Sequence, residues 1–438
     1  MQFMKLRRNL RVLNAKSFTI KAACFLGAFL ILQAALLFTS CHKSKKPVII
    51  WTSCAEFASY VEEFNASQDK AQAVVVYKKE PARSLPPAKD EETPDIIIGP
   101  WLKNSSTRKY FTPVDYMFSE QSINKSLFYS QLIDYGKINE KQYLLPVSFN
   151  LPAIVFKSEN ENLMPDSHLI TLDEIKTVAG NFNQQNESGV YTAMGYGPSW
   201  DKNFLYLVSK LEGASYREKG TSFSWNSKSM LATITYLKDW TTARNTSTTA
   251  EQNFQFKYLY MPEYKQVSSN RCLFSYMTSD ELFSLSSEEQ SGLSFRWIQK
   301  DNTVPVDDDI ITMGLYKDSK NTKDAEVFLS WFTKSTTQES ILQRAADMHL
   351  DNITFGIANG FSSIKTVNEN IYPTYYRQLL GNIPTGKYIT TPNILPYRWP
   401  SLKEKVVIPF LSESTNIDSS ATVASLETRI AEWSKQYF

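Results

Sequence analysis

The sequence predicts a mixed α/β fold whose first strands form an open parallel sheet. Residues 48–52 read Val-Ile-Ile-Trp-Thr, a β-branched apolar run typical of a buried strand. Phe57, Val61 and Phe64 then recur at helical spacing, and residues 73–77 form a second β-branched run. A helical crossover of this length makes the two strands parallel neighbours in a right-handed unit.

The next residues extend this sheet. Ser53, with Glu56 three positions later, predicts a capping box at the start of the helix. Residues 81–94 are rich in proline and predict a loop, and residues 95–98 predict a third strand that is closed by a Gly-Pro-Trp turn ending at Trp101. Ligands of open α/β sheets bind beyond the carboxyl ends of the strands, where Ser53 and Trp101 lie.

The rest of the chain continues this mixture of strands and helices. Further strands are predicted at 143–147, 153–156, 271–277, 293–298 and 310–315. Further helices are predicted at 203–211, 228–240, 324–332 and 338–346, and from residue 422 to the C-terminus.

The composition is that of a globular chain with a large core. The chain has 438 residues, of which 42% are hydrophobic and 13% are aromatic, including 26 Phe, 23 Tyr and 9 Trp. This aromatic content excludes a disordered chain, because burying it offsets the entropy lost on folding. No internal repeat or periodic glycine suggests a solenoid, a propeller or a collagen-like chain.

Positive charge is concentrated at the N-terminus. The formal net charge is +2, but residues 1–40 hold six basic side chains and no acidic one, so the remainder carries −4. A body of this charge has no general electrostatic attraction to a polyanion. The sequence therefore predicts no nucleic-acid partner.

Residues 1–40 predict an export signal, in which a basic stretch precedes the uncharged apolar run 22–38. Cys41 follows, and the arrangement resembles a bacterial lipoprotein signal, although Phe38 stands where that pattern usually has Leu. Cys41 would then be lipidated and begin the tether 41–46. We expect an exported protein that is lipid-anchored to the bacterial cell membrane, on its periplasmic side or at the cell surface. The alternative is an uncleaved transmembrane anchor.

Catalytic signatures are absent from the sequence. Cys54 and Cys272 are expected to be free, because two distant cysteines do not make a disulfide framework. The three His residues lack metal-ligand spacing, and we find no nucleophile elbow or phosphate-binding glycine loop. We therefore expect no metal, no cofactor and no enzyme. A glycoside hydrolase needs only two carboxylates, however, and stays open as an alternative.

Six blocks occur in order along the chain: 48–64, 93–99, 142–153, 223–240, 273–277 and 317–332. Together they resemble family 1 extracellular solute-binding proteins, the maltose-binding-like receptors of carbohydrate ABC importers. The resemblance covers most of residues 47–365 and depends on the order of the blocks, because each is a short hydrophobic pattern. Two departures stand out: the loop 81–94 replaces a longer helix, and three aspartates at 307–309 replace a common Gly-Gly turn.

The resemblance implies a two-lobed periplasmic-binding-protein-like (type II) α/β fold, in which each lobe is a mixed sheet flanked by helices. The implied N-lobe holds 47–148 and 312–354, and the implied C-lobe holds 149–311 and 355–438. Chain crossings near 148–150, 309–312 and 356–361 would form the hinge. The resemblance also implies a monomer that delivers its solute to the transmembrane subunits of an ABC permease.

A sugar receptor needs flat apolar surfaces for pyranose rings and convergent polar groups for hydroxyls. The chain offers such residues at predicted loop positions: Trp51, Ser53, Trp101, Asn150, Trp200, Asp201, Thr278, Ser279, Asp309 and Trp399. The strand pattern around Trp51 favours the core, whereas Trp101 and Trp399 fit core and cleft equally. The loop around Trp200 favours the cleft, and Asp309 also fits a solvated turn.

These patterns predict a lipid-anchored receptor that binds a small solute between two lobes and closes by a hinge. An uncharged carbohydrate is the favoured class of solute. Two other classes of function stay open: an extracellular glycoside hydrolase and an adhesive or structural surface lipoprotein.

Overall fold

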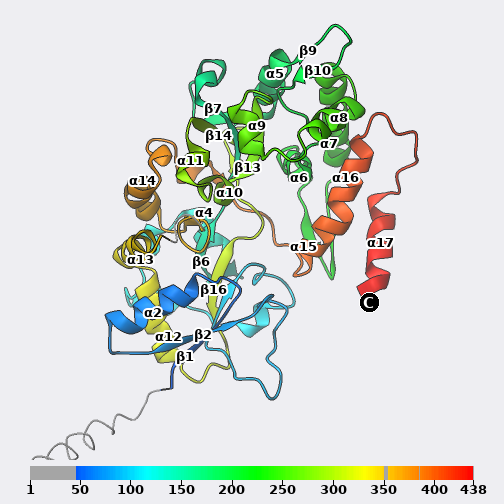
Figure 1. Cartoon of the computed structure of the whole chain (residues 1–438). Coiled ribbons are helices and arrows are strands. Elements are labelled where there is room, and N and C mark those ends of the chain that lie inside the picture. The colour runs from blue at the N-terminus through cyan, green and yellow to red at the C-terminus, as the bar shows by residue number, and fades with distance from the viewer. Residues whose placement is uncertain (1–45, 350–353, 384, 438) are drawn as a thin grey trace, which may run out of the picture. The chain divides into compact units, whose positions relative to one another are not determined.

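The computed structural model describes residues 46–349, 354–383 and 385–437 (Figure 1). Residues 47–438 form one compact unit. The predicted signal 1–40, the predicted lipidation site Cys41 and the tether up to residue 45 lie outside the described residues. No helix in the described part of the chain combines the length and the apolar character that a membrane crossing requires.

The first sheet has six strands and is mixed. In sheet order these are β17 (Phe361–Ser362), β6 (Leu145–Phe149), β16 (Ile311–Leu315), β3 (Ile96–Gly99), β1 (Val48–Thr52) and β2 (Ala73–Tyr77). β1 pairs in parallel with β2 and β3, which confirms the predicted parallel start. β16 lies antiparallel between β3 and β6.

Three helices pack with this sheet: α2 (Phe57–Ser67), α12 (Thr322–Phe332) and α13 (Ser335–Asp347). Aromatic pairs join α2 to α12, with 5.1 Å between the ring centroids of Phe64 and Phe328. The predicted capping box at Ser53 and Glu56 is wrong, since Glu56 itself is the N-cap and no side chain caps the helix. The chain makes a turn there first, in which the Phe57 amide bonds to the Cys54 carbonyl.

The second sheet has four strands, in the order β13 (Phe274–Thr278), β7 (Pro152–Lys157), β14 (Leu293–Gln299) and β8 (Leu169–Thr171). β7 pairs antiparallel with β13 and β14, whereas β8 pairs in parallel with β14. Residues 152–156 of β7 are buried, as a central strand covered on both faces requires.

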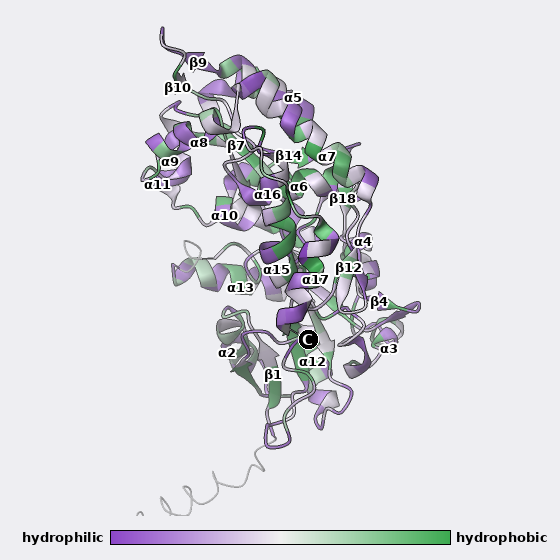
Figure 2. Cartoon of the chain, turned by 90° about the vertical axis from the view of Figure 1, so that its right-hand side faces the viewer, coloured by the Kyte–Doolittle hydropathy of each residue, from purple (hydrophilic) through white to green (hydrophobic). Residues whose placement is uncertain are grey.

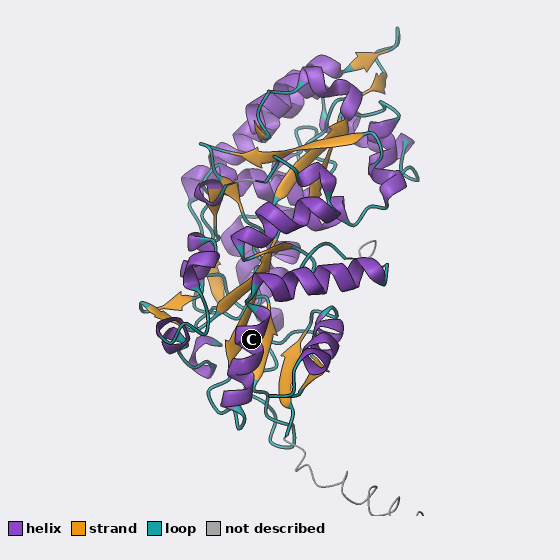
Figure 3. Cartoon of the chain, turned by 90° about the vertical axis from the view of Figure 1, so that its left-hand side faces the viewer, coloured by secondary structure: helices purple, strands orange, loops and turns teal. Residues whose placement is uncertain are grey.

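The larger helices outside the first sheet are α5 (Leu172–Phe182), α6 (Lys202–Leu211), α7 (Ser227–Trp240), α8 (Thr248–Lys257), α16 (Ile408–Thr415) and α17 (Leu426–Tyr437). Helix α5 contacts β8, α16 packs on α6 and α7, and α17 packs on residues 403–407. Apolar residues gather around the strands, and helices flank the strands of both sheets (Figures 2 and 3). The predicted starts of α6, α7, α12 and α13 lie within three residues of the observed ones.

Shorter helices and strands occur elsewhere in the described part of the chain. The helices are α3 (Asp115–Ser119), α4 (Ser130–Tyr135), α9 (Glu263–Ser268), α10 (Ser279–Phe283), α11 (Ser287–Gln290), α14 (Tyr372–Tyr375) and α15 (Trp399–Leu402). The strands pair as β4 (Lys137–Ile138) with β5 (Lys141–Gln142), β9 (Gln184–Gln185) with β10 (Tyr191–Ala193), β11 (Arg217–Lys219) with β12 (Ser222–Ser224), and β15 (Val304–Pro305) with β18 (Ile389–Thr390).

The chain passes between the two sheets in short connecting segments. β6 continues into β7 through Asn150 and Leu151, and the segment after β14 returns through residues 306–310 to β16. β17 pairs with β6 in the first sheet, although the predicted bounds placed residues 355–438 in the other lobe. The polar residues of these crossings therefore lie where the two sheets meet.

We expect Ile154→Ala to lower the free energy of unfolding by about 3 kcal/mol, because it leaves a cavity in the central strand β7. Ile154 is 0% exposed and packs within the core of the second sheet. Urea unfolding followed by tryptophan fluorescence measures the change. Val190→Ala is the matched control, because Val190 is 57% exposed and should change stability by less than about 0.5 kcal/mol. Equal losses in both variants would contradict the prediction.

Candidate functional site

A cavity of about 920 Å³ lies at the junction of the two sheets. Pro100 and Trp101 line it from the end of β3, and Asn150 and residues 307–309 line it from the chain crossings. Helix α6, the end of β13 and the segment from Trp399 to Glu413 supply the other walls. The cavity thus lies at the carboxyl end of β3, where an open α/β sheet binds its ligands.

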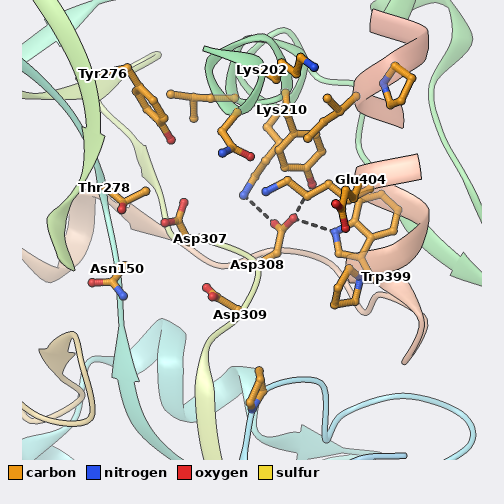
Figure 4. Close-up of a pocket in the computed structure, with 18 of the residues that line it drawn as sticks. Asn150, Lys202, Lys210, Tyr276, Thr278, Asp307, Asp308, Asp309, Trp399 and Glu404 are labelled. Carbon is orange, nitrogen blue, oxygen red and sulfur yellow. Dashed lines mark hydrogen bonds and ion pairs between the residues drawn. The ribbon is translucent and has the colours of Figure 1, made fainter. Parts of the chain in front are cut away.

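Five of the ten predicted site residues line this cavity: Trp101, Asn150, Thr278, Asp309 and Trp399. They come from five separate parts of the sequence, which the fold brings together. Figure 4 shows Asn150, Thr278 and Asp309 on one side of the cavity and Trp399 on the other.

Three of the other predicted residues lie in or beside the protein core. Trp51 is 1% exposed, and the Lys78 ammonium lies 4.2 Å from its ring centroid. Trp200 stacks on Phe254 at a centroid distance of 5.5 Å, and its indole N–H donates to the Glu251 carbonyl. Ser53 lies beside Gly99 and does not itself line the cavity.

Asp201 and Ser279 have local structural roles. Asp201 caps helix α6, because its Oδ1 accepts the amide hydrogens of Asn203 and Phe204 at 2.6 and 3.2 Å. Ser279 is fully buried, and its hydroxyl donates to Asn150 Oδ1 at 2.6 Å. Ser279 therefore supports a cavity residue instead of facing the cavity itself.

Asn150 joins the crossing segments to one another. Its carbonyl accepts the Asp307 amide at 3.0 Å, and its side-chain amide donates to the Asn359 carbonyl at 2.9 Å. With the bond from Ser279, both ends of its side chain are engaged by protein groups. Asn150 therefore holds the first chain crossing against the second crossing and against the loop before β17.

Trp101 presents its ring from a strained backbone position. Its φ of 64° lies in the left-handed region, which costs free energy for a bulky residue and often marks functional sites. The Asn104 side chain stabilises this turn by donating to the Trp101 carbonyl at 2.7 Å. The partly buried ring packs against apolar clusters of both sheets and also lines the cavity.

The negative charge of Asp308 is balanced by a lysine within the cavity wall. Lys210 Nζ lies 2.7 Å from Asp308 Oδ1, while the Tyr206 hydroxyl and the Trp399 indole N–H both donate to Oδ2, at 2.5 and 2.9 Å. Burial by itself would raise the pKa of Asp308, but the charges of Lys210 and Lys403 and these hydrogen bonds outweigh it and lower the pKa. Asp308 is thus a structural carboxylate.

Asp307 and Asp309 lie on the opposite side, toward Thr278 and Asn150 (Figure 4). In the described part of the chain neither forms an ion pair. Burial, followed by the charge of Asp309, raises the pKa of Asp307 to about 7. Burial, followed by the charge of Asp280, raises the pKa of Asp309. These two carboxyl groups are therefore available to exchange hydrogen bonds with a polar ligand.

Trp399 does not offer an open stacking face. It is 0% exposed and packs among Tyr206, Tyr216 and Phe223, with centroid distances of 5.1 to 6.1 Å. Its contribution is the indole N–H that fixes Asp308. Trp101 is the predicted tryptophan that lines the cavity without complete burial.

The sequence patterns did not identify the wall of the cavity that helix α6 forms. Lys202, Tyr206 and Lys210 all line the cavity and recur every four residues, so they share one helix face. That spacing of polar and aromatic residues was readable in the sequence. The pairing of Lys210 with Asp308 was not, because the two residues are 98 positions apart.

The cysteines match the sequence prediction, since Cys54 and Cys272 are free. Burial, followed by the charge of Glu56, raises the pKa of the Cys54 thiol to about 12. The thiolate is the nucleophilic form of cysteine, so Cys54 is not an activated nucleophile.

We expect Asp308→Ala to lower the free energy of unfolding by about 3 kcal/mol, because Lys210 would keep a largely buried charge without its partner. Chemical denaturation at pH 7 measures the loss. Asp318→Ala is the matched control, since that carboxylate is exposed and 3.9 Å from Lys317, and it should change stability by less than about 1 kcal/mol. A loss in Asp308→Ala no larger than the control would show that the pair adds no stability.

We expect Asp307→Asn to have a higher free energy of unfolding than the wild type. This difference should grow from about pH 4 to about pH 8 and then level off. The folded chain retains the Asp307 proton up to about pH 7, whereas an unfolded aspartate loses it near about 3.9. Because the folded state binds more protons in this window, the wild type loses stability as pH rises through it. Denaturation at a series of pH values tests this, with Asp318→Asn as control. A stability difference that stays constant with pH would refute it.

The fold has clear matches among solved structures, although no protein-family model and no curated protein matches the sequence. The cyclic α-maltosyl-1,6-maltose binding protein of Arthrobacter globiformis is 13% identical, with a TM-score of 0.58 over 89% of this chain and 97% of that one. The galacto-N-biose/lacto-N-biose I-binding protein of the Bifidobacterium longum ABC transporter is 16% identical, with a TM-score of 0.58 over 90% and 98%.

An ABC substrate-binding protein of Listeria monocytogenes, in complex with cycloalternan, is 12% identical, with a TM-score of 0.57 over 89% of this chain and 97% of that one. All three are named as binding proteins. The shared architecture extends over both sheets and their helices. The chain therefore has the two-lobed α/β fold of the maltose-binding-protein-like receptors of ABC transporters.

Proposed function

We propose that this protein is a carbohydrate-binding receptor of an ABC importer. The observation that carries the proposal is the cavity at the junction of the two sheets, which combines an aromatic ring with convergent polar side chains. Two of the solved structures that share the fold are named as binding proteins for particular saccharides, and the third is in complex with cycloalternan, which supports the same class of ligand.

The chemistry of the cavity suits a polyhydroxylated ligand. The ring of Trp101 is an apolar surface for the C–H face of a pyranose, and Asn203, Thr278 and Asp309 supply hydrogen-bonding groups around it. The cavity volume of about 920 Å³ is at the upper end of the range of about 300 to 1,000 Å³ for ligand sites. That room favours an oligosaccharide over a single sugar ring.

The proposal includes a cycle of opening and closing. The proposed N-lobe contains the first sheet and the proposed C-lobe contains the second, so a bound sugar would touch Trp101 on one lobe and helix α6 on the other. The crossings at Asn150 and at 306–310 would act as the hinge, and ligand contacts to both lobes would favour the closed form.

The cellular setting completes the proposal. Cys41 would carry the lipid that holds the monomeric receptor at the membrane, and the closed form would deliver its sugar to the transmembrane subunits of the permease. The lipoprotein-like signal at the N-terminus supports this anchor.

We expect the thermal unfolding temperature of the full chain to rise when the cognate sugar is added. The chain is kept in a detergent without a sugar headgroup. Ligand at about 100 times its dissociation constant adds about 2.7 kcal/mol of stability. The panel should contain neutral oligosaccharides, polyols, amino acids, peptides and a chromogenic glycoside. A shift with a carbohydrate and no release of chromophore is expected. A panel without any shift, after denaturation and refolding to remove carried-over ligand, would overturn the proposal.

We expect Trp101→Ala to weaken sugar binding by about tenfold or more, because it removes the stacking surface of the cavity. Isothermal titration with the sugar found in the panel measures this loss. Trp331→Ala is the matched control, since Trp331 is partly buried against the core of the first sheet and lies outside the cavity. Equal sugar affinity in the two variants would show that Trp101 does not contribute to binding.

A further inference from the structure

Glu218 forms a hydrogen-bonded contact between the two lobes, away from the sugar cavity. It lies on β11 of the β11–β12 hairpin, between helices α6 and α7 of the second lobe. Its carboxylate accepts the Ser105 amide hydrogen, with both oxygens 3.1 Å from the nitrogen, and the Ser105 hydroxyl at 2.8 Å. Ser105 follows β3 of the first lobe, 113 positions earlier in the chain.

Ser105 belongs to the loop that carries Trp101. Within this loop Asn104 donates to the Trp101 carbonyl and accepts the amide hydrogens of Ser106 and Thr107, at 2.9 and 3.1 Å. The Thr107 hydroxyl donates to the Leu102 carbonyl at 2.5 Å. Because these bonds tie residues 101–107 together, a force that holds Ser105 also holds the backbone of Trp101.

The surroundings of the contact favour a carboxylate. Lys103, Arg108 and Lys137 line a small cavity of about 130 Å³ together with Ser105 and Glu218. Glu218 supplies the one acidic side chain among the described residues that line it. The Glu218 amide also donates to the Ile394 carbonyl at 2.7 Å, which anchors the hairpin within its own lobe. Three basic side chains of the first lobe thus line this cavity with one carboxylate of the second, and one of them, Lys137, is also paired with Asp134 at 2.5 Å.

We propose that Glu218 is an interlobe latch, which holds the Trp101 loop against the second lobe and slows release of the bound ligand. The part of this proposal that concerns ligand release rests on the proposed function. The contact itself does not, because it is formed by protein groups alone. Glu218 is a positioning residue: it acts on the ligand through the loop 101–107 and does not line the sugar cavity.

Hydrogen exchange at the Ser105 amide tests the contact without any ligand. In Glu218→Ala this amide should exchange about tenfold faster or more, because its acceptor is gone. The Thr107 amide should keep its exchange rate, since its acceptor is Asn104. Glu187→Ala removes an exposed glutamate from another hairpin of the same lobe and should change neither rate. An unchanged Ser105 rate in Glu218→Ala would overturn the latch.

The rate of sugar release tests the consequence of the contact. Glu218→Ala should raise the dissociation rate about tenfold and leave the association rate nearly unchanged, and the difference should shrink at high salt. Ser105→Ala, which loses only the hydroxyl, should raise the dissociation rate by less than Glu218→Ala does. In the Glu218→Ala background, Ser105→Ala should cause no further rise in the dissociation rate. If Glu218→Ala does not fold, the dissociation rates of Ser105→Ala and Glu218→Gln test the same contact.

The outcomes separate the latch from the proposed function. If no sugar binds to the wild type, the proposed function fails while the exchange experiment still decides whether the contact exists. If sugar binds but its dissociation rate is the same in Glu218→Ala and in Glu187→Ala, the latch is refuted and the receptor is retained.

Discussion

The arrangement of the two lobes depends on the hydrogen bonds of Asn150. This residue accepts the backbone amide of the second chain crossing, donates to the loop before β17 and accepts the buried Ser279 hydroxyl. A side-chain amide suits this position because it carries donors and an acceptor without a charge that would require neutralisation. With the crossings joined at one point, the walls of the cavity are placed relative to one another by short segments of chain.

The three consecutive aspartates 307–309 have different partners and therefore different roles in the cavity wall. Asp308 turns toward Lys210, Tyr206 and Trp399, and these partners keep its carboxylate charged. Asp307 and Asp309 turn toward the cavity, where burial raises the pKa of both. The charge of Asp309 adds to the rise for Asp307, and the charge of Asp280 adds to the rise for Asp309. One carboxylate therefore stabilises the wall, and the other two leave hydrogen-bonding capacity for a ligand.

Local patterns were enough to predict most of the fold. The strands at 48–52 and 73–77 have the predicted bounds. The first is buried inside the sheet, whereas the second forms its edge and has half-buried or exposed β-branched residues. The capping box failed because a turn at Cys54 delays the helix to Phe57. For the site, two of the residues chosen at strand ends, Trp101 and Thr278, line the cavity. Burial of Trp51 and Trp399 depends on what packs over them, which the sequence pattern does not contain.

The sequence by itself determined the order of the elements, the parallel start of the first sheet and the collection of polar residues at strand ends. These features follow from periodicity and turn chemistry, which act over a few residues. Only the tertiary structure decided which aspartate is neutralised, which tryptophan borders the cavity and where Glu218 finds its donors. Those outcomes depend on pairs about a hundred positions apart, such as Lys210 with Asp308 and Ser105 with Glu218, and such pairs form only when the packed lobes bring them within hydrogen-bonding distance.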